Sequence, residues 1–391
     1  MTRRHLLVTN DFPPKVGGIQ SYLWELWRRL DPSTFSVLTA SSDPHAAAFD
    51  ADQAARGIEI SRVPGRILFF PTRRNARVVA AHVERTGADL VIYDPLVPLG
   101  LLAGRVSTPA VQLLHGAEVA IPGRLPLAAS AVRRALSSAA GVIAAGPYPE
   151  AEARRAARTG LPPVLQVPPG VDCTRFVPLA EAQRRQVRAR LGLPIDGPLI
   201  VSISRLVPRK GMDTLIEASA LLGTSHPTAT VAIGGSGRDA DRLERLVARH
   251  RAPVTMLGRV ADEDLADLVA AADVFVMACR TRWAGLEQEG FGIVFLEAAA
   301  AGVPQVAGRS GGSHDAVVHG ETGLVLDHPD DPRELAEALR RLLDDEVLRR
   351  GMGSRGRERA QASFDYDVLA RRLGDALAAG WPDTPAGRWD A

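Results

Sequence analysis

Residues 287–298 read Glu-Gln-Glu-Gly-Phe-Gly-Ile-Val-Phe-Leu-Glu-Ala, a glycine-rich turn that opens an apolar helical pattern. Such a turn directs free backbone N–H groups and the positive end of the helix towards an anion. Glu289 precedes the predicted helix, and Glu297 lies within it. Two carboxylates around this turn suit a ligand that carries sugar hydroxyls on both sides of a diphosphate. The structural alternative makes Glu289 a helix cap and Glu297 a buried, hydrogen-bonded acid.

Short β-rich runs alternate with helical patterns on both sides of this stretch, which is typical of parallel sheets covered by helices. The strands expected in the first half are His5–Thr9, Phe35–Leu38, Ile58–Val63, Leu90–Tyr93, Val111–Leu114, Val142–Ala145 and Val164–Val167. Those expected in the second half are Leu199–Ile203, Thr230–Ile233, Val254–Leu257, Val274–Met277, Gln305–Ala307 and Leu324–Leu326. The run Pro168–Asp172, followed by the charged segment Glu181–Arg190, marks the linker. Ligands are expected at the carboxyl ends of the strands, at the mouth between two doubly wound domains.

Composition supports this organisation and excludes several classes of protein. A chain of 391 residues suggests two domains of average size. The net charge of +2 argues against a nucleic-acid binder, which normally carries a strong basic excess. Cys173 and Cys279 are too few for a disulfide framework. With neither a signal-peptide pattern nor an apolar run of about 20 residues, the sequence predicts a cytoplasmic protein.

Other glycine-containing loops follow expected strands. Gly17 and Gly18 come after the first strand, where a plain turn and a ligand site are equally compatible with the sequence. The segment Ser204–Gly211 carries Arg205, Arg209 and Lys210, whose charges repel each other unless an anion such as a diphosphate lies between them. The alternative for this segment is a solvated basic turn.

Two further features bear on the ligand. The run Gly234–Gly237 lets backbone come close to a nucleotide. Asp239-Ala240-Asp241 superficially matches a metal-binding pattern, but it stands at the start of a predicted helix, where aspartate is a favoured cap. We therefore predict helix capping by this segment and no metal requirement.

Taken together, these motifs resemble those of the retaining glycosyltransferases of family 4. The Glu289…Glu297 pair looks like their E-x7-E motif, and the similarity extends to the loops around it. The other matching segments are Ser204–Leu206, Lys210–Gly211, Ala301–Pro304, Gly311–Gly312 and Gly320–Gly323. The resemblance implies a GT-B fold, with two Rossmann-like domains facing across a cleft and a C-terminal helix that crosses back to the first domain. The implied domains are 1–175, with about 365–391, and 176–364.

The resemblance also implies roles for individual residues. Arg205 and Lys210 would neutralise the diphosphate, Glu289 would hold the donor sugar, and His115 would touch that sugar near the reacting carbon. The implied donor-binding residues are Gly17, Gly18, Gly235, Val260, Phe291, Gly292, Ile293, Val294 and Glu297. Gln20 would face the acceptor or the phosphates. Related enzymes usually place Glu after the later Gly-Gly pair, whereas this sequence has Asp315, which leaves the fine geometry of this loop open.

Finer features resemble one branch of the family, the GDP-mannose-dependent mannosyltransferases acting on phosphatidylinositol mannosides. These features are Thr9–Pro14, Gly17–Tyr22 and Cys279–Arg282. The implied donor is GDP-mannose as a co-substrate, without a cofactor, and the implied acceptor is an inositol phospholipid. Phe69, Phe70, Arg73 and Arg74 combine apolar and basic side chains, as binders of anionic membrane surfaces do.

The sequence is also compatible with other functions. The two phenylalanines are equally compatible with simple core positions, so peripheral contact with the inner face of the cell membrane stays open. A family 4 enzyme for another nucleotide sugar and a soluble acceptor is the nearest competing function. A nucleotide-sugar 2-epimerase shares the architecture, but the Glu289…Glu297 pair argues against it. A non-catalytic nucleotide-sugar-binding protein is the remaining class.

Overall fold

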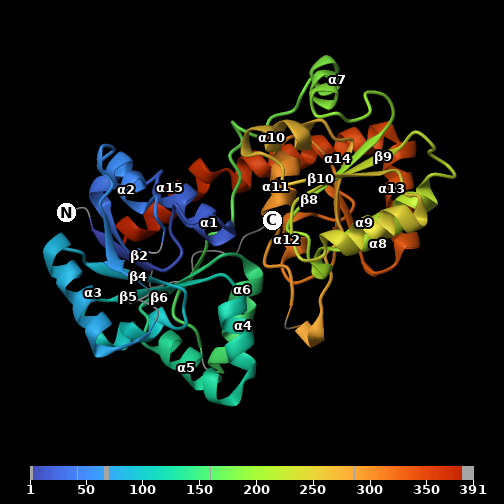
Figure 1. Ribbon diagram of the computed structural model, residues 1–391. Helices are drawn as coiled ribbons and strands as arrows, with labels where there is room; N and C mark the ends of the chain where they lie inside the picture. The colour runs from blue at the N-terminus through green and yellow to red at the C-terminus, as the bar shows by residue number, and fades with distance from the viewer. Residues whose placement is uncertain (1–2, 42, 66–69, 159, 286, 381–391) are drawn as a thin grey trace. The chain divides into compact units, whose positions relative to one another are not determined.

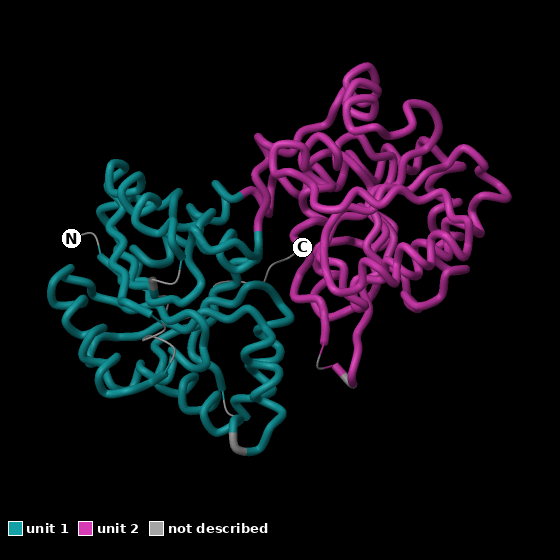
Figure 2. Tube along the Cα trace, viewed as in Figure 1, with its two compact units in different colours: residues 1–169, 366–391 teal, residues 170–365 magenta. Residues whose placement is uncertain are grey.

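The computed structural model describes residues 3–41, 43–65, 70–158, 160–285 and 287–380. Two compact units make up the chain (Figure 2). Unit 1 consists of residues 1–169 and 366–391, and unit 2 consists of residues 170–365. Each unit has its own parallel sheet and its own buried apolar clusters.

The described residues of unit 1 form a seven-stranded sheet in the order β3-β2-β1-β4-β5-β6-β7. The strands are β1 (His5–Thr9), β2 (Phe35–Ser41), β3 (Ile60–Pro64), β4 (Leu90–Asp94), β5 (Ala110–Leu114), β6 (Gly141–Ala144) and β7 (Val164–Gln166). All neighbouring strands are parallel. Because helices cover both faces of a parallel sheet, its strands are nearly continuous apolar runs.

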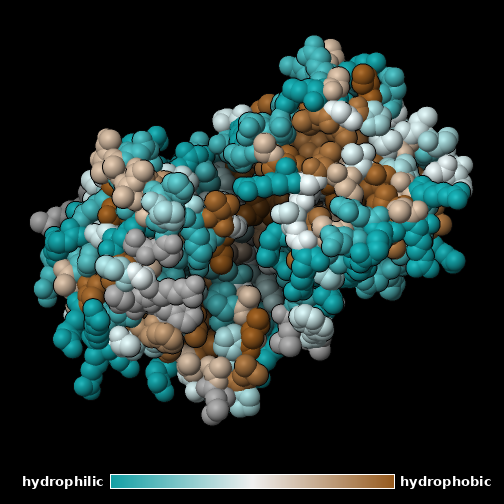
Figure 3. Space-filling model, viewed as in Figure 1, coloured by the Kyte–Doolittle hydropathy of each residue, from teal (hydrophilic) through white to brown (hydrophobic). Residues whose placement is uncertain are grey.

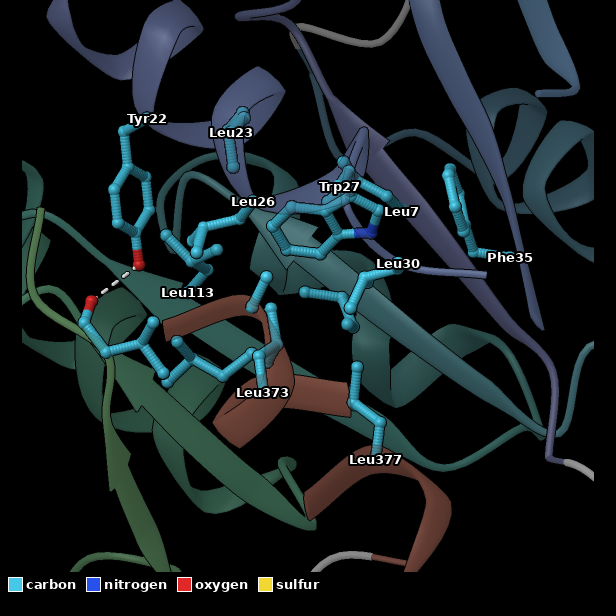
Figure 4. Packing of buried hydrophobic residues seen from close by; sticks show 14 of the residues in the cluster. Leu7, Tyr22, Leu23, Leu26, Trp27, Leu30, Phe35, Leu113, Leu373 and Leu377 are labelled. Atoms are coloured by element: carbon cyan, nitrogen blue, oxygen red, sulfur yellow. Dashed lines mark hydrogen bonds between the residues drawn. The ribbon is translucent and has the colours of Figure 1, made fainter. Parts of the chain in front are cut away.

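Alternate residues of β1 serve opposite faces of the sheet. Leu7 packs into the cluster that includes Leu26 and Leu373, whereas Leu6 and Val8 pack into the cluster that includes Val79. The helices of unit 1 are α1 (Gly18–Trp27), α2 (Ala46–Ala54), α3 (Arg73–Thr86), α4 (Ala117–Arg124), α5 (Pro126–Ser137), α6 (Pro147–Ala157) and α15 (Tyr366–Ala378). Figure 4 shows the α1–α15 cluster, in which Leu373 and Leu377 lie beneath Leu26 and Trp27.

The described residues of unit 2 form a six-stranded parallel sheet in the order β10-β9-β8-β11-β12-β13. Its strands are β8 (Leu199–Ile203), β9 (Thr230–Gly234), β10 (Val254–Gly258), β11 (Val274–Met277), β12 (Gln305–Gly308) and β13 (Gly323–Leu326). Its helices are α7 (Glu181–Arg190), α8 (Met212–Leu222), α9 (Ala240–His250), α10 (Asp262–Ala270), α11 (Ile293–Ala300), α12 (Ser313–Ala316), α13 (Pro332–Asp344) and α14 (Glu346–Arg359).

Both sheets have the strand order of doubly wound nucleotide-binding folds. In each, the chain winds outwards in one direction and then returns to the centre to continue in the other. The reversal lies between β1 and β4 in unit 1, and between β8 and β11 in unit 2. The carboxyl ends of these strand pairs are the expected ligand positions in such folds. Two Rossmann-like units, as predicted from the sequence, are therefore confirmed.

The end of the chain returns to unit 1, as the sequence also predicted. After α14 and a short π-helical segment, Ala360–Phe364, α15 packs against α1 (Figure 1). Arg29, which follows the C-terminal end of α1, forms an ion pair of 2.6 Å with Asp367 at the start of α15, and its guanidinium lies over the ring of Tyr366. The final helix is thus an integral part of the unit 1 core.

The charged segment Glu181–Arg190 is the helix α7 of unit 2, rather than part of the linker. Arg188 is buried and forms an ion pair of 2.9 Å with Asp273, next to the start of β11. In the view of Figure 3, hydrophilic residues cover much of each unit, with groups of apolar residues among them. No helix in the described part of the chain is long and apolar enough to cross a membrane.

Candidate active site

A buried ion pair lies at the carboxyl end of the unit 2 sheet. The Lys210 ammonium donates to the Glu289 carboxylate at 2.6 Å, and each residue is 8% exposed. Lys210 ends the short 3-10 turn Pro208–Lys210 that follows β8, and Glu289 precedes α11. Two residues that the sequence assigned to the donor site therefore lie in direct contact, 79 positions apart in the chain.

Other charges surround this pair. The Arg209 guanidinium lies between two carboxylates, 3.9 Å from Glu289 and 3.8 Å from Glu287. Arg282 also approaches Glu287, at 2.9 Å. Within the described chain, the side chain of Arg205 makes no hydrogen bond or ion pair, and the residue is exposed. Protein carboxylates thus offset the charges of Arg209 and Lys210, while the charge of Arg205 remains available to an anion.

The glycine-rich turn before α11 is held in place by backbone contacts. The Glu289 carbonyl accepts a hydrogen bond from the Gly312 N–H at 3.0 Å, and the Glu289 N–H donates to Ser310. A Cβ at Gly311 would lie 2.1 Å from the Glu289 carbonyl oxygen, so only glycine permits this approach. The backbone following Glu289 is therefore set by the loop after β12.

Gly292 is the N-cap of α11, with a φ of 89°, and it supplies no capping side chain. A Cβ here would lie 2.7 Å from the ring of Phe295. Since α11 has no side-chain cap, the amides of its first turn, including those of Ile293 and Val294, are suited to an anionic ligand. Phe291, in the same turn, is buried against Phe364. Glu289 is not the cap of this helix, which excludes the structural alternative for it.

Glu297 projects from the second turn of α11. Its side chain is half-buried and has no hydrogen-bond partner among the described residues. Burial raises the pKa of Glu297 to about 7, with Arg175 acting to lower this pKa and Asp262 acting to raise it. An acceptor without a partner is poised to receive hydroxyl donors from a ligand, unlike the satisfied buried acid of the structural alternative.

The loop Gly234–Gly237 packs closely against the protein's own backbone. A Cβ at Gly235, whose φ is 133°, would lie 1.8 Å from the Ser204 carbonyl oxygen. A Cβ at Gly237 would lie 2.2 Å from the Leu206 carbonyl oxygen. A Cβ at Gly234 would lie 2.6 Å from a methyl group of Val260. These glycines thus bring the loop after β9 onto the segment that carries Arg205, and a close approach to a nucleotide stays a prediction.

The expectation for Asp239 needs correction. Asp239 occupies the N-cap position of α9, but its side chain makes no capping hydrogen bond. Both carboxylate oxygens accept instead from the guanidinium of Arg242, at 2.7 and 2.8 Å. The Asp239 carboxylate is therefore bonded to the Arg242 guanidinium and not to a backbone N–H of the first turn of α9.

Unit 1 carries a second polar cluster, at the point where its strand order reverses. His115 follows β5, and its Nε2 lies 2.6 Å from Asp94 at the end of β4. The other oxygen of Asp94 accepts from the Thr9 hydroxyl at 2.6 Å, at the end of β1. The sequence reasoning identified His115 and missed Asp94. The signal available was its place directly after an expected strand, next to the strand that His115 follows.

Contacts between its own side chains organise the loop after β1. The amide of Gln20 donates to Asp11 at 2.6 Å, and Lys15 donates to the same oxygen at 2.6 Å. A Cβ at Gly17 would lie 2.3 Å from the Gln20 side-chain oxygen, while Gly18 has open space around it. Gln20 is 7% exposed, so its side chain organises this loop, and contact with an acceptor stays a prediction.

Asp315, which stands where related enzymes usually have Glu, lies in α12. Arg359 donates to the backbone carbonyls of Asp315 and Ala316, both at 2.9 Å. Burial raises the pKa of the Asp315 carboxyl, with His314 and Arg359 opposing it. The shorter side chain thus belongs to a short helix whose backbone is fixed by Arg359 of α14.

Comparison with known proteins places this geometry in a family. Residues 16–175 match the model for Glycosyltransferase Family 4, and residues 183–359 match the model for Glycosyl transferases group 1. A GDP-mannose-dependent alpha-(1-6)-phosphatidylinositol monomannoside mannosyltransferase from Mycobacterium tuberculosis is 41% identical, over 96% of this chain and 98% of that protein. A monoacylated alpha-(1-6)-phosphatidylinositol monomannoside mannosyltransferase from Corynebacterium glutamicum, also GDP-mannose-dependent, is 36% identical, over 96% of this chain and 98% of that protein.

Solved structures agree on the fold. Sucrose-phosphate synthase from Thermosynechococcus elongatus matches with a TM-score of 0.78 and 25% identity, over 96% of this chain and 99% of that one. HepE from Anabaena, solved in complex with UDP, matches with a TM-score of 0.78 and 21% identity, over 96% and 100% of the two chains. The fold is GT-B, and relatives of 36–41% identity extend along nearly the whole chain. The chain therefore belongs to the group 1 glycosyltransferases of family 4.

Proposed function

We propose that this protein transfers mannose from GDP-mannose to a phosphatidylinositol mannoside lipid, with retention of the anomeric configuration. The observation that carries the proposal is the buried Lys210–Glu289 pair beside the uncapped start of α11. It combines a cation for a diphosphate, a carboxylate for sugar hydroxyls and free helix amides in one place. The choice of mannose and of the lipid rests on the activity named for the similar mycobacterial and corynebacterial proteins.

The donor would occupy the carboxyl end of the unit 2 sheet. Arg205 and Lys210 would bind the diphosphate, together with the amides of Ile293 and Val294. Glu297 would accept the ribose hydroxyls, and Glu289 those of the mannose. Val260, after β10, would lie near the base. In this arrangement Lys210 exchanges part of its contact with Glu289 for contact with the diphosphate, which frees the Glu289 carboxylate for the sugar.

We favour attack of the acceptor on the same face of the sugar that the diphosphate leaves, over a covalent intermediate on a protein carboxylate. A covalent intermediate requires a free carboxylate at the anomeric carbon. Asp94 uses both oxygens in hydrogen bonds of 2.6 Å and is fully buried, so it is a poor nucleophile. In the same-face scheme the bond between the anomeric carbon and the diphosphate oxygen breaks as the acceptor oxygen bonds to that carbon. The acceptor's proton passes to the departing diphosphate, whose charge Arg205 and Lys210 stabilise.

The proposal is tested by assaying transfer of labelled mannose from GDP-mannose to a phosphatidylinositol monomannoside. Lys210→Met should lower turnover roughly 10²-fold or more, the usual scale for removing one group that stabilises developing charge. Lys210→Arg, which keeps the charge in another geometry, should retain more activity than Lys210→Met. Near-wild-type turnover of Lys210→Met at saturating donor would contradict the role of Lys210. Interconversion of the nucleotide sugar without an acceptor would instead indicate an epimerase.

We also propose that the reaction needs no metal, because Arg205 and Lys210 supply the positive charge at the diphosphate. Activity should persist after removal of divalent ions with a chelator. Loss of activity in the chelator, followed by its return on addition of Mg²⁺ or Mn²⁺, would overturn this part of the proposal.

For a lipid acceptor we propose a cytoplasmic protein that binds the inner face of the cell membrane through the start of α3. Phe70 is 61% exposed, and Arg73 and Arg74 are exposed on the first turn of α3. Phe69, predicted to share this surface, lies outside the described residues. Two cations at the positive end of a helix are unfavourable by themselves. An anionic lipid surface would compensate this cost.

Membrane binding is expected to depend on these arginines. The variant Arg73→Glu/Arg74→Glu should lose cosedimentation with vesicles that contain anionic phospholipid, because it replaces attraction by repulsion. Arg245→Glu/Arg249→Glu, at exposed positions of α9, makes the same change in net charge and should retain binding. Equal loss of binding in both variants would indicate a non-specific charge effect and contradict the proposed surface.

A further inference from the structure

A buried hydrogen-bonded chain joins three neighbouring strands in unit 1. Thr9, Asp94 and His115 stand at or directly after the carboxyl ends of β1, β4 and β5. The Thr9 hydroxyl donates to one oxygen of Asp94, and His115 Nε2 contacts the other, both at 2.6 Å. Asp94 and Thr9 have no exposed surface, whereas the His115 side chain is 11% exposed. Of these three side chains, only that of His115 is therefore accessible to a ligand.

The remaining contacts of His115 hold the residue in place and leave one ring nitrogen, Nδ1, without a partner in the described chain. The His115 backbone N–H donates to the Glu118 carboxylate at 2.6 Å. The ring of Tyr22 meets the imidazole edge-to-face at a centroid distance of 5.5 Å. Tyr22 is itself held by a hydrogen bond of 2.7 Å from its hydroxyl to the Val167 carbonyl (Figure 4). Within the described chain, Nδ1 of His115 makes no hydrogen bond, so it is the ring nitrogen left for a ligand.

Several acidic groups determine the charge of this ring. Burial acts to lower the pKa of His115, but the charge and hydrogen bond of Asp94 outweigh it, and Glu118 and Asp11 add to the effect. The pKa of His115 is therefore raised, which favours the imidazolium. Lys15, the basic residue of the loop that carries Asp11, forms an ion pair of 2.6 Å with Asp11. An imidazolium bonded to Asp94 through Nε2–H carries its second proton on Nδ1, where it is a donor.

We propose that Asp94 is a positioning residue for the transfer reaction, which orients His115 so that Nδ1–H donates to an oxygen of the transferred sugar. Asp94 would also neutralise the imidazolium. A hydrogen-bond donor is then offered without net positive charge beside a carbon that becomes cation-like during transfer. The inference rests on the proposed function, because it takes the sugar to be the ligand of His115.

The test is a double-mutant cycle read through pH profiles of kcat/KM. Asp94→Asn keeps the shape of the side chain and removes its charge. It should lower kcat/KM about 10²-fold at pH 7.5, the scale of a misplaced reacting group, and move the alkaline limb of the profile to lower pH. In a His115→Ala background the same Asp94→Asn change should cost less than about twofold, since Asp94 would act only through His115.

Two results would overturn the inference. One is an equal cost of Asp94→Asn with and without His115, which would indicate direct contact with substrate or a purely structural role. The other is a loss of the same factor at every pH. Thr9→Val, which keeps the carboxylate and removes one of its hydrogen bonds, should lower activity less than Asp94→Asn and leave the alkaline limb in place. Thr9→Val also tests the inference if Asp94→Asn does not fold. A shift of the alkaline limb of its kcat/KM profile would contradict positioning through the charge of Asp94.

A readout without substrate separates this inference from the proposed function. NMR titration of the His115 ring should show a lower pKa in Asp94→Asn than in the wild type. Absence of mannose transfer by the wild type would overturn the proposed function alone. An unchanged titration of His115 in Asp94→Asn would overturn the role of Asp94 alone.

Discussion

Glu297 is a residue whose charge state should control donor binding. It is half-buried on α11, it has no hydrogen-bond partner in the described chain, and burial raises its pKa to about 7. Below pH 7 the neutral acid predominates, and above it the carboxylate does. Ribose hydroxyls donate best to the carboxylate, so the affinity for GDP should rise as the pH increases from 6 to 8.

Calorimetric titration with GDP across this range checks the prediction. Glu297→Gln should bind GDP more weakly than the wild type at pH 8 and show little pH dependence, because its amide does not titrate. Retention of the wild-type pH dependence in Glu297→Gln would assign the effect to another group, such as the diphosphate itself.

At the same scale, the sequence singled out candidate site residues but not the contacts that they make with one another. Lys210 and Glu289 were both predicted to face the donor, but their mutual ion pair depends on bringing β8 and the segment before α11 together. Asp94 was not singled out because its contacts with Thr9 and His115 arise only when β4 lies between β1 and β5. The sequence likewise did not predict that the charge of Arg209 is offset by the carboxylates of Glu287 and Glu289.

Among the elements, β1 carries a buried histidine that should make unit 1 sensitive to acid. His5 is 3% exposed and accepts a hydrogen bond of 3.0 Å from the Trp27 indole of α1. Burial, assisted by Arg4, lowers the pKa of His5 to about 3. Because the unfolded state takes up this proton near pH 6.5, the stability that neutral His5 contributes is present above pH 6.5. It is lost as the pH falls towards 3, at about 1.4 kcal/mol per pH unit.

Urea unfolding of unit 1 between pH 6.5 and pH 4.5 measures this loss, which should be roughly 2–3 kcal/mol from His5 by pH 4.5. His5→Asn removes the titrating group, so its stability should fall less steeply with acid than that of the wild type. His250→Asn, on the exposed end of α9, controls for the loss of a surface histidine. Equal pH slopes in the wild type and His5→Asn would contradict the prediction.

The elements also show what the pattern of the sequence can and cannot predict. The strands were predicted nearly to their ends, because strands buried on both faces are continuous apolar runs. Helix α14 was not predicted, since Gly351, Gly353 and Gly356 weaken its helical pattern. A Cβ at Gly353 would lie 2.1 Å from the Gly302 carbonyl oxygen, so close packing against the end of α11 requires glycine there. Tertiary contact thus overrides propensity in this helix.

For the whole molecule, the division into two units has a thermodynamic consequence. Each unit has its own sheet and core, and every donor-binding residue proposed around Lys210 and Glu297 belongs to unit 2. GDP should therefore raise the unfolding free energy of unit 2, by about 2.7 kcal/mol at a concentration one hundred times its Kd. Hydrogen exchange in β8 reports unit 2, and exchange in β1 reports unit 1. Protection in β8 alone would mean that unit 2 holds the nucleotide and unfolds independently.

Equal protection of β1 and β8 would instead mean that the nucleotide engages both units or that they unfold together.

The identity of the donor can be tested by comparing how strongly different nucleotide sugars stabilise the protein under the same conditions. Stabilisation by GDP-mannose, but not by UDP-glucose, UDP-N-acetylglucosamine or ADP-glucose, is the outcome expected for a mannosyltransferase. Stabilisation confined to a UDP or ADP sugar would contradict GDP-mannose as the donor. It would remain compatible with diphosphate binding by Lys210 and the first turn of α11. Those groups are proposed to bind the diphosphate, which all four ligands share, so the base and the sugar would have to be selected by other contacts.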